Sequence, residues 1–304
     1  MDILTITLFL ALAVRMGTPL LLACLGEIYA ERSGILNLGI EGTMMLGAAM
    51  GFIAAYETQN LLVGFVAAAL VGSLLGLLHA IIVIFLRGNQ TISGLAITFA
   101  GIGLSMLIAH EYVGKVVRGS LPIVPLFSDV PILSAFFNQN IMVYFAYVAS
   151  IVMWFVLFHT RIGIEIRATG ESPIVAESAG VNVERVRLIC AILSGAFAGL
   201  GGAYISLIDM RSWTDLLTAS KGWIALALVL VSLWNPLLAL FTSYLFGALY
   251  AFQVFLRIDI NLAKMVPYAA TIPVLAIASK LSKRVGVPIL GKPYIREEEA
   301  LHGV

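Results

Sequence analysis

Charged residues are scarce in this sequence. Of 304 residues, 12% are Asp, Glu, Lys or Arg, whereas an ordinary soluble domain has roughly a quarter. Hydrophobic residues make up 61% of the chain, and the mean hydropathy is +1.01. A chain this poor in charge cannot cover a water-exposed globular surface, and its net charge of +1 gives no indication of binding to nucleic acid. The composition predicts a membrane protein.

Five long runs contain no charged residue. They are Thr58 to Leu86, Gly88 to His110, Val130 to Thr160, Leu188 to Ile208 and Gly222 to Leu256. Crossing about 30 Å of hydrocarbon takes roughly 20 helical residues, and lipid offers the backbone no hydrogen-bonding partners, so these runs are expected to be helices. Residues 3 to 25 are expected to be a retained first helix, because no signal-peptide pattern precedes them. We predict an all-α polytopic membrane protein with residues 1–304 as one transmembrane domain.

Lys and Arg predict the orientation, because cytoplasmic loops are enriched in both. Segment 161–187 holds four arginines, and the tail holds Lys280, Lys283, Arg284, Lys292 and Arg296. We therefore place segment 161–187, the tail 280–304 and the C-terminus in the cytoplasm. Arg87 fits the same side, and the loop from Glu111 to Asp129 fits the outside.

This orientation requires two crossings within Gly222 to Leu256. Trp234-Asn235-Pro236 supplies a break between them. The first piece, 222–233, would be only about 18 Å long, and broken helices of this kind line translocation paths in transporters. The whole chain then has about nine spans, with about eight or ten as alternatives, and its N-terminus lies outside.

Several catalytic and metal-binding patterns are absent. No G-x-x-x-x-G-K-[ST] phosphate loop and no G-x-S-x-G elbow occurs. His110-Glu111 begins a zinc-binding H-E-x-x-H pattern, but Gly114 stands where the second histidine is needed. Cys24 and Cys190 lie in apolar runs and are expected to be buried thiols. We expect no enzymatic activity, no ATP hydrolysis and no metal on this chain.

Polar residues interrupt the apolar pattern between Gly26 and Gly51. Glu27, Glu31 and Arg32 indicate a cytoplasmic turn after the first span. Asn37 and Glu41 are four residues apart, which predicts one face of a helix. A carboxylate at membrane depth faces a polar partner or a water-filled path. Two interpretations remain open: Glu41 lines a path, or it pairs with a neighbouring helix through Arg15.

Other polar and aromatic residues are also candidates for contact with a solute, although each type is more typical of packing. With Asn37 and Glu41, the candidate set is His79, Asn89, Gln90, Phe99 and Trp223. Trp213 is instead expected to anchor the outer interface, where Trp is enriched.

Residues 164–181 predict a short amphipathic helix rather than a solvated loop. Glu165 to Ala168 and Pro173 to Ala179 can each form a helical turn. Ser172 can cap the second turn, Pro173 suits its first position, and Gly180 can end it.

A weak internal similarity relates Gly72 and Gly76 to Gly195 and Gly199. Inverted repeats are common in transporters, but a Gly-xxx-Gly spacing also promotes helix packing. We favour packing for these four glycines.

Three segments together resemble a known family. They are AERSGILNLGIEGTMMLGA, IGIEIRATGESPIVAESAGVNVERVR and SGAFAGLGGAYISL. They are similar to the permease subunits of bacterial ABC importers in the branched-chain amino acid and ribose permease superfamily. Within it, they resemble the nucleoside-type permeases that work with a basic-membrane-protein lipoprotein receptor.

The resemblance implies a pore of two permease subunits, expected to be different chains, in the bacterial cytoplasmic membrane. Separate ATPase subunits would bind ATP and Mg, and an extracytoplasmic lipoprotein would deliver the solute. No cofactor is implied on this chain. Segment Asn37 to Met45 would lie near the path. The helix that couples to the ATPase would contain Arg167, Ala168, Gly170, Glu171, Ser172, Pro173, Ala176 and Gly180.

Three other functions remain possible at this point. One is a sugar or branched-chain amino acid permease of the same superfamily. Another is an ion-coupled secondary transporter that uses Glu41 and His79 as a relay. The last is a membrane scaffold without a solute path.

Overall fold

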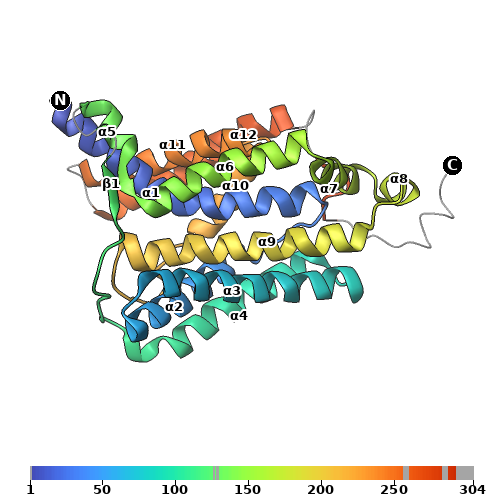
Figure 1. Ribbon diagram of the computed structural model, residues 1–304, viewed down its shortest axis with the longest axis horizontal. Coiled ribbons are helices and arrows are strands. Elements are labelled where there is room, and N and C mark those ends of the chain that lie inside the picture. The colour runs from blue at the N-terminus through green and yellow to red at the C-terminus, as the bar shows by residue number, and fades with distance from the viewer. Residues whose placement is uncertain (1, 126, 128–129, 256–259, 283–286, 292–304) are drawn as a thin grey trace.

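The computed structural model describes residues 2–125, 127, 130–255, 260–282 and 287–291, and its fold is all-α (Figure 1). In this described part, six helices are long and apolar enough to cross a membrane: Ile3–Arg32, Leu61–Phe85, Gln90–Ile108, Ile141–His159, Val183–Asp209 and Pro236–Gln253. The predicted all-α polytopic class is confirmed. The count of about nine spans stays a prediction, and Lys283, Arg284, Lys292 and Arg296 of the basic tail lie outside the described residues.

The helices and strands follow one another with short connections. The first half contains α1 (Ile3–Arg32), α2 (Ile40–Thr58), α3 (Leu61–Ala80) with the π-turn η1 (Ile81–Phe85), α4 (Gln90–Ile108) and the 3₁₀ turn η2 (His110–Tyr112). The strands β1 (Ile123–Pro125) and β2 (Asn138–Asn140) pair antiparallel on either side of α5 (Pro131–Phe137). The rest comprises α6 (Ile141–His159), α7 (Arg161–Glu171), α8 (Pro173–Ser178), α9 (Val183–Tyr204) with the π-turn η3 (Ile205–Asp209), α10 (Lys221–Val231), α11 (Pro236–Phe255) and α12 (Ile260–Ser282).

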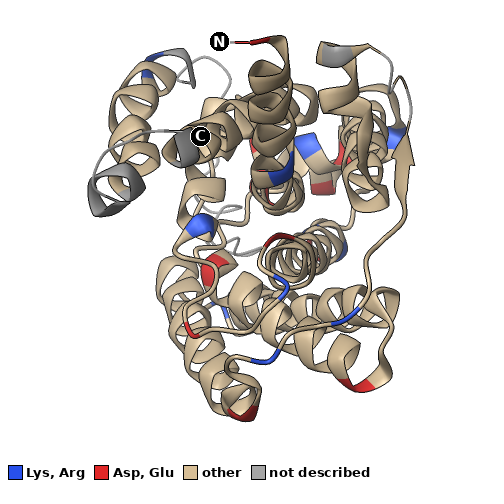
Figure 2. Cartoon of the chain, turned by 90° about the vertical axis from the view of Figure 1, so that its left-hand side faces the viewer, with Lys and Arg blue, Asp and Glu red and all other residues tan. Residues whose placement is uncertain are grey.

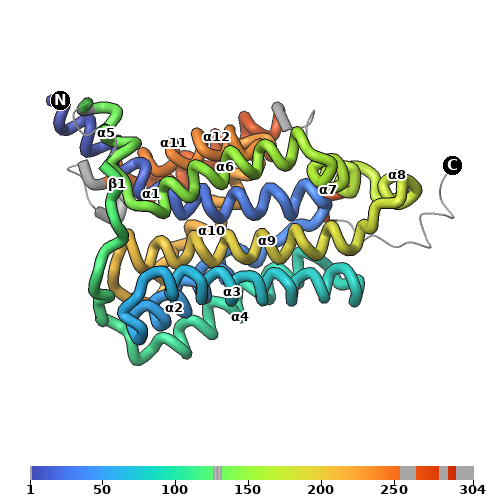
Figure 3. Tube along the Cα trace, in the orientation of Figure 1, coloured from blue at the N-terminus to red at the C-terminus, as the bar shows by residue number. Residues whose placement is uncertain are grey.

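The bundle has two distinct ends. The strands and α5 lie at one end, called here the β1 end, and α7 and α8 project from the other, called the α8 end (Figures 1 and 3). Viewed from the β1 end, the helices carry few charged residues (Figure 2). The sequence predicts that the α8 end is cytoplasmic and the β1 end is outside.

Helices α1 and α9 run antiparallel through the middle of the bundle (Figure 1). A Cβ atom on Gly26 of α1 would overlap the backbone of Ser194 in α9. Every residue of α1 from Gly17 to Arg32 is buried, as expected for a helix surrounded by others on all sides. Helices α2 and α3 pack on α9, and α6, α10 and α11 pack on α1, whereas α4 packs on α2 and α12 packs on α10 and α11.

The four glycines that share a spacing in the sequence lie against one another. A Cβ atom on Gly72 of α3 would overlap the carbonyl oxygen of Gly195 in α9, and one on Gly76 would overlap that of Ala191. Small residues allow two helix backbones to approach this closely. The packing interpretation of these glycines is confirmed.

A second close glycine contact joins α11 to α1. On α11, Gly247 lies against the carbonyl oxygen of Ala13 and the backbone of Gly17 in α1. Gly76 of α3 makes the corresponding contacts with α9, four residues apart in the same order. The α1/α11 and α9/α3 pairs are therefore packed through the same kind of close glycine contact.

The predicted break before Pro236 is confirmed. Helix α10 ends at Val231 and α11 begins at Pro236. Between them, Leu233 and Trp234 adopt left-handed backbone conformations with φ of 52° and 54°. The Asn235 side chain accepts a hydrogen bond from the N–H of Leu237 at 3.0 Å, which caps the new helix.

Candidate functional site

A buried, non-helical segment, residues 33–39, separates α1 from α2. Gly34 has a φ of 92°, a conformation that glycine adopts without strain, and the Asn37 side chain accepts a hydrogen bond from the N–H of Gly39 at 2.9 Å. Local bonds of this kind compete with helix formation. The prediction that Asn37 and Glu41 share a helical face is therefore wrong, since α2 begins only at Ile40.

Side chains of four helices satisfy the backbone of this segment. Two side chains accept hydrogen bonds from backbone N–H groups of the segment: Glu27 from Asn37 at 3.1 Å, and Gln90 from Leu36 at 2.7 Å. Two donate to its backbone oxygens: Thr98 to Leu38 at 2.8 Å, and Arg187 to Ser33 at 3.1 Å. The Nε2 atom of His79 lies 3.2 Å from the backbone oxygen of Leu36. We call residues 33–39 with Glu27, His79, Gln90, Thr98 and Arg187 the polar centre. Irregular backbone at membrane depth requires such partners.

The residues predicted to contact a solute divide into three groups. Asn37, His79 and Gln90 meet in the polar centre, where all three are at most 2% exposed. Asn89 caps α4 by accepting from the N–H of Ile92 at 3.0 Å. Phe99 and Trp223 are 72% and 38% exposed, so they lie on the outer surface of this chain.

Glu41 connects α2 to the start of α10. Its carboxylate is buried and accepts hydrogen bonds from the Thr218 hydroxyl at 2.5 Å, the Ser220 N–H at 3.1 Å and the Gly222 N–H at 2.6 Å. A carboxylate is stabilised at a helix N-terminus by the unpaired N–H groups and by the helix dipole. Glu41 thus pairs with a neighbouring element, as one interpretation expected.

The expected partner of Glu41 is wrong, because Arg15 lies elsewhere. Arg15 is 3.6 Å from the carboxylate of Asp209 and donates to the Ile208 carbonyl at 2.5 Å. Lys221 Nζ is 3.6 Å from the other oxygen of Asp209. The sequence analysis predicted a buried role for Glu41 but not for Asp209. Asp209 stands at the end of an apolar run and resembles a loop residue.

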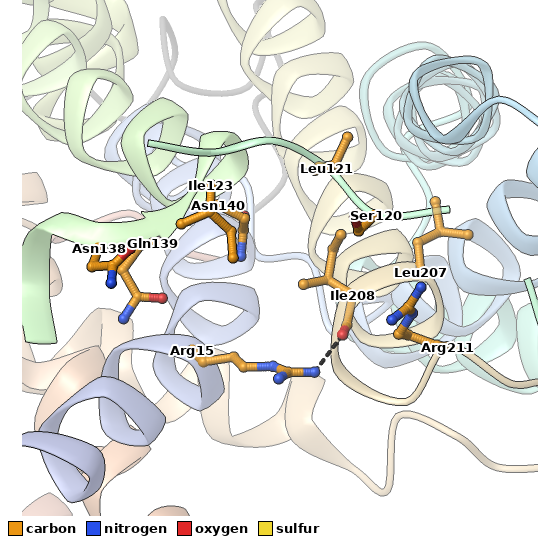
Figure 4. Close-up of a pocket in the computed structure, with 10 residues that line it drawn as sticks. All are labelled: Arg15, Ser120, Leu121, Ile123, Asn138, Gln139, Asn140, Leu207, Ile208 and Arg211. Atoms are coloured by element: carbon orange, nitrogen blue, oxygen red, sulfur yellow. Dashed lines mark hydrogen bonds between the residues drawn. The ribbon is translucent and has the colours of Figure 1, made fainter. Parts of the chain in front are cut away.

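Arg15 also borders a pocket of about 210 Å³ towards the β1 end (Figure 4). Its polar lining residues are Arg15, Ser120, Asn138, Gln139, Asn140 and Arg211. Amide and guanidinium groups offer hydrogen-bond donors, and the amides also offer acceptors. Such a lining is suited to the hydroxyl and carbonyl groups of a polar solute.

Glu27, Glu31 and Arg32 do not form a cytoplasmic turn. Helix α1 continues through all three, and each is at most 8% exposed. The Trp234 indole donates to Glu31 at 2.5 Å, and Ser194 donates to Glu27 at 2.7 Å. The expectation failed because buried partners on α9 and beyond α10 stabilise these side chains inside the bundle.

Trp213 is also placed differently from the expectation. It is fully buried, its ring centroid is 6.1 Å from that of Phe52 in α2, and its backbone pairs with that of Gly114 and Lys115. It therefore anchors the connection between α9 and α10 inside the protein, not at a lipid interface.

The predicted amphipathic segment is helical. Ser172 and Pro173 occupy the N-cap and first positions of α8, although the Ser172 hydroxyl makes no capping hydrogen bond, and Gly180 follows with a φ of 87°. Of the eight candidate coupling residues, Gly170, Pro173 and Ala176 are buried, Arg167, Ala168 and Ser172 are half-buried, and Glu171 and Gly180 are exposed.

The exposed and buried sides of α8 have different roles. Ile174 and Val175 are 40% and 67% exposed and stand next to the exposed Glu171. Gly170 lies against the backbone of Arg32 at the end of α1. The segment is therefore attached to the bundle through α7 and presents an apolar surface beyond it.

Cys24 and Cys190 are free, buried thiols, as predicted. Among the residues that the structure describes, no group of three or more His, Cys, Asp or Glu side chains could hold a metal ion. The polar side chains described above are suited to binding a polar solute and to coupling the movements of neighbouring helices.

Comparison with known proteins identifies the family. The family described as branched-chain amino acid transport system, permease component, matches residues 9–275. The chain belongs to this family. It is thus a multi-pass ABC transporter permease subunit and not itself an enzyme.

Named relatives extend over most of the chain. The guanosine ABC transporter permease protein NupQ of Bacillus subtilis is 32% identical over 92% of this chain and 94% of its own length. The nucleoside ABC transporter permease protein NupC of Lactococcus lactis is 30% identical over 97% and 98%. TsgC13 of Haloferax volcanii, provisionally named a glucose ABC transporter permease, is 40% identical over 79% and 75%. The two former organisms each have a second, less similar permease, NupP and NupB.

Proposed function

We propose that this permease forms half of the pore of an ABC importer for nucleosides. The observation that carries the proposal is its likeness to two permeases named for guanosine and nucleosides, which covers 92% and 97% of this chain. The likeness to the permease provisionally named for glucose is higher but covers 79%. The nucleoside relatives therefore match more of the chain.

The proposed partners follow from the family. An ATPase subunit binds ATP and Mg at the α8 end, a second permease chain completes the pore, and an extracytoplasmic lipoprotein delivers the solute. A heterodimeric pore is supported by the two different permeases of B. subtilis and L. lactis that resemble this chain. The membrane is the bacterial cytoplasmic membrane, with the C-terminus inside.

The coupling step is assigned to α7 and α8. Glu171, Ile174 and Val175 are exposed and supply the contact with the ATPase, while the buried residues fix the segment to the bundle. Movement of α7 reaches the polar centre through Gly170, which touches the carbonyl of Arg32 immediately before segment 33–39. Discrete packed contacts of this type carry coupling between sites.

The solute path is assigned to the surface next to α2 and α10. Trp223 is 38% exposed on α10, and an exposed indole can stack on a nucleobase. Asn37, Glu41, His79 and Gln90 position the elements behind this surface, because their hydrogen bonds are made within the chain. Asn89 caps α4 and Phe99 lies on it, and α4 packs against α2.

Uptake measurements test the substrate. Cells that carry the complete transporter are expected to accumulate labelled guanosine, and cells that lack this permease are not. Unlabelled adenosine should compete, whereas glucose should not. Unchanged guanosine uptake together with loss of glucose uptake in the deletion strain would instead assign a sugar permease, the alternative that the 40% identical relative favours.

An ion-coupled transporter makes a different prediction. It would need a relay between Glu41 and His79, yet Glu41 is bonded to the start of α10 and His79 to Ser93 and Leu36. Purification in mild detergent should recover an ATPase subunit with this permease. Solute transport by vesicles that contain the complex should require ATP on the side of the membrane where the ATPase is bound. Transport driven by an ion gradient without that subunit would contradict the proposal.

A further inference from the structure

Helix α10 is short and is held at its N-terminus by a side chain of another helix. It has 11 residues, about 16 Å at 1.5 Å per residue, which is half of the hydrocarbon thickness. Both oxygens of the Glu41 carboxylate are used there: one accepts from Thr218 and Ser220, and the other from Gly222. The first turns of α2 and α10 therefore meet at one buried carboxylate.

The other end of α10 is held by α1. The Trp234 indole donates to Glu31 at 2.5 Å. The Arg32 guanidinium donates to the carbonyl oxygens of Leu233 and Trp234 at 3.3 and 3.4 Å. Arg32 is the residue whose own carbonyl oxygen lies against Gly170 of α7, so the far end of α10 and the segment beside α8 meet at the same residue.

Unusual backbone conformations flank α10 on both sides. Five of the nine described non-glycine residues with positive φ are Leu216, Ala219, Ser220, Leu233 and Trp234. Residues with side chains rarely adopt this region, and such conformations persist only where surrounding contacts impose them. They concentrate at switch regions and hinges.

We propose that α10 is the gate of the transport path. It moves as a rigid helix about two hinges, residues 216–220 and 232–235, and Glu41 is the latch that holds it in the conformation described here. Displacement of α7 by the ATPase moves Arg32, which releases the far hinge and then the latch. The proposal rests on the proposed transport function and adds the moving element to it.

Electron spin resonance distances in the assembled transporter test the gate. Spin labels are placed at Ala227→Cys, half-buried on α10, and at Leu74→Cys, exposed on α3. The native Cys24 and Cys190 are buried and remain unlabelled. The distance distribution should shift between the nucleotide-free and the vanadate-trapped states. A control pair, Leu74→Cys with Ile151→Cys on α6, should shift less, since neither helix belongs to the gate.

The latch is tested in the same labelled protein. Glu41→Gln keeps one oxygen for Thr218 and Ser220 but turns an amide N–H₂ towards the N–H of Gly222. The nucleotide-free distribution should then move towards the vanadate-trapped one. Glu57→Gln, an exposed residue of α2 whose carboxylate accepts from Tyr112, is the matched control and should leave the distribution unchanged.

Nucleoside uptake by the labelled transporter is measured alongside the distances. An α10 distance that is equal in both nucleotide states while uptake proceeds overturns the gate. This outcome leaves nucleoside transport itself intact, so it is distinguishable from failure of the proposed function.

Discussion

Gly170 of α7 lies directly against the carbonyl oxygen of Arg32 at the C-terminus of α1, so that no Cβ atom fits between them. Ser33, the next residue, begins the non-helical segment whose backbone is held by four helices. The contact thus connects the segment beside α8 directly to the residue that precedes the polar centre. Because the two backbones touch at Gly170, a larger residue at this position tests whether the contact carries coupling.

Gly170→Ala is expected to reduce nucleoside uptake while the ATPase remains bound, because the added methyl group must displace α7 from α1. The ATPase activity of the purified complex should become less dependent on the receptor lipoprotein. Gly103→Ala on α4 is the control, since a Cβ atom there meets nothing within 4 Å. Equal uptake by the two variants would contradict a coupling role for the contact.

Replacement of Glu171 and Ser172 by arginine should release the ATPase. Both positions border the exposed apolar residues of α8, and bulky charges there would be desolvated on docking. The amount of ATPase that copurifies is expected to fall, with normal insertion of the permease. Glu111→Arg, at an exposed position beyond α4, makes a comparable charge change away from α8 and should leave the yield unchanged.

Gly72→Ala and Gly247→Ala are expected to destabilise the protein by similar amounts. Each methyl group would overlap a backbone carbonyl, of Gly195 in one case and of Ala13 in the other. Overpacking of this kind costs about 1 to 3 kcal/mol. The midpoint of thermal unfolding in detergent should fall for both, and a loss in only one of them would argue against equivalent packing of the α3/α9 and α11/α1 pairs.

His79→Phe should destabilise the polar centre. The histidine ring is bonded to Ser93 at 3.0 Å and lies 3.2 Å from the Leu36 oxygen, and phenylalanine leaves both buried groups without this partner. An unsatisfied buried polar group costs about 1 to 3 kcal/mol. Thermal unfolding and proteolysis measure this loss. Unchanged stability with altered solute affinity would instead indicate direct contact with the solute.

Phe99→Ala is expected to have almost wild-type uptake. The side chain is 72% exposed and leaves the core unchanged when truncated, because surface substitutions are usually within about 0.5 kcal/mol. Uptake kinetics provide the measurement, and Trp223→Ala serves for comparison. If Phe99→Ala alone raised the KM for nucleosides, α4 would belong to the solute path.

The sequence predicted elements well where the pattern was long and local. Charge-free runs located the spanning helices, Trp234-Asn235-Pro236 located the break after α10, and residues 173–180 located α8. These features depend on the backbone's need for internal hydrogen bonds and on proline and glycine geometry, so they are readable without knowledge of distant contacts.

The site was less predictable because its partners are far apart in the chain. Glu41 bonds to Gly222, 181 residues away, and Glu27 bonds to Ser194, 167 residues away. No local pattern encodes such pairs. Arg15 was accordingly assigned to the wrong carboxylate, and Trp213 to a lipid interface.

The π-turns at the ends of α3 and α9 affect how this chain is compared with others. In each, an N–H bonds to the carbonyl five residues earlier, Leu86 to Ile81 and Met210 to Ile205, so one residue more is accommodated than in an α-turn. Relatives without the π-turn of α9 are therefore expected to have one residue fewer in the turn that ends at their counterpart of Asp209.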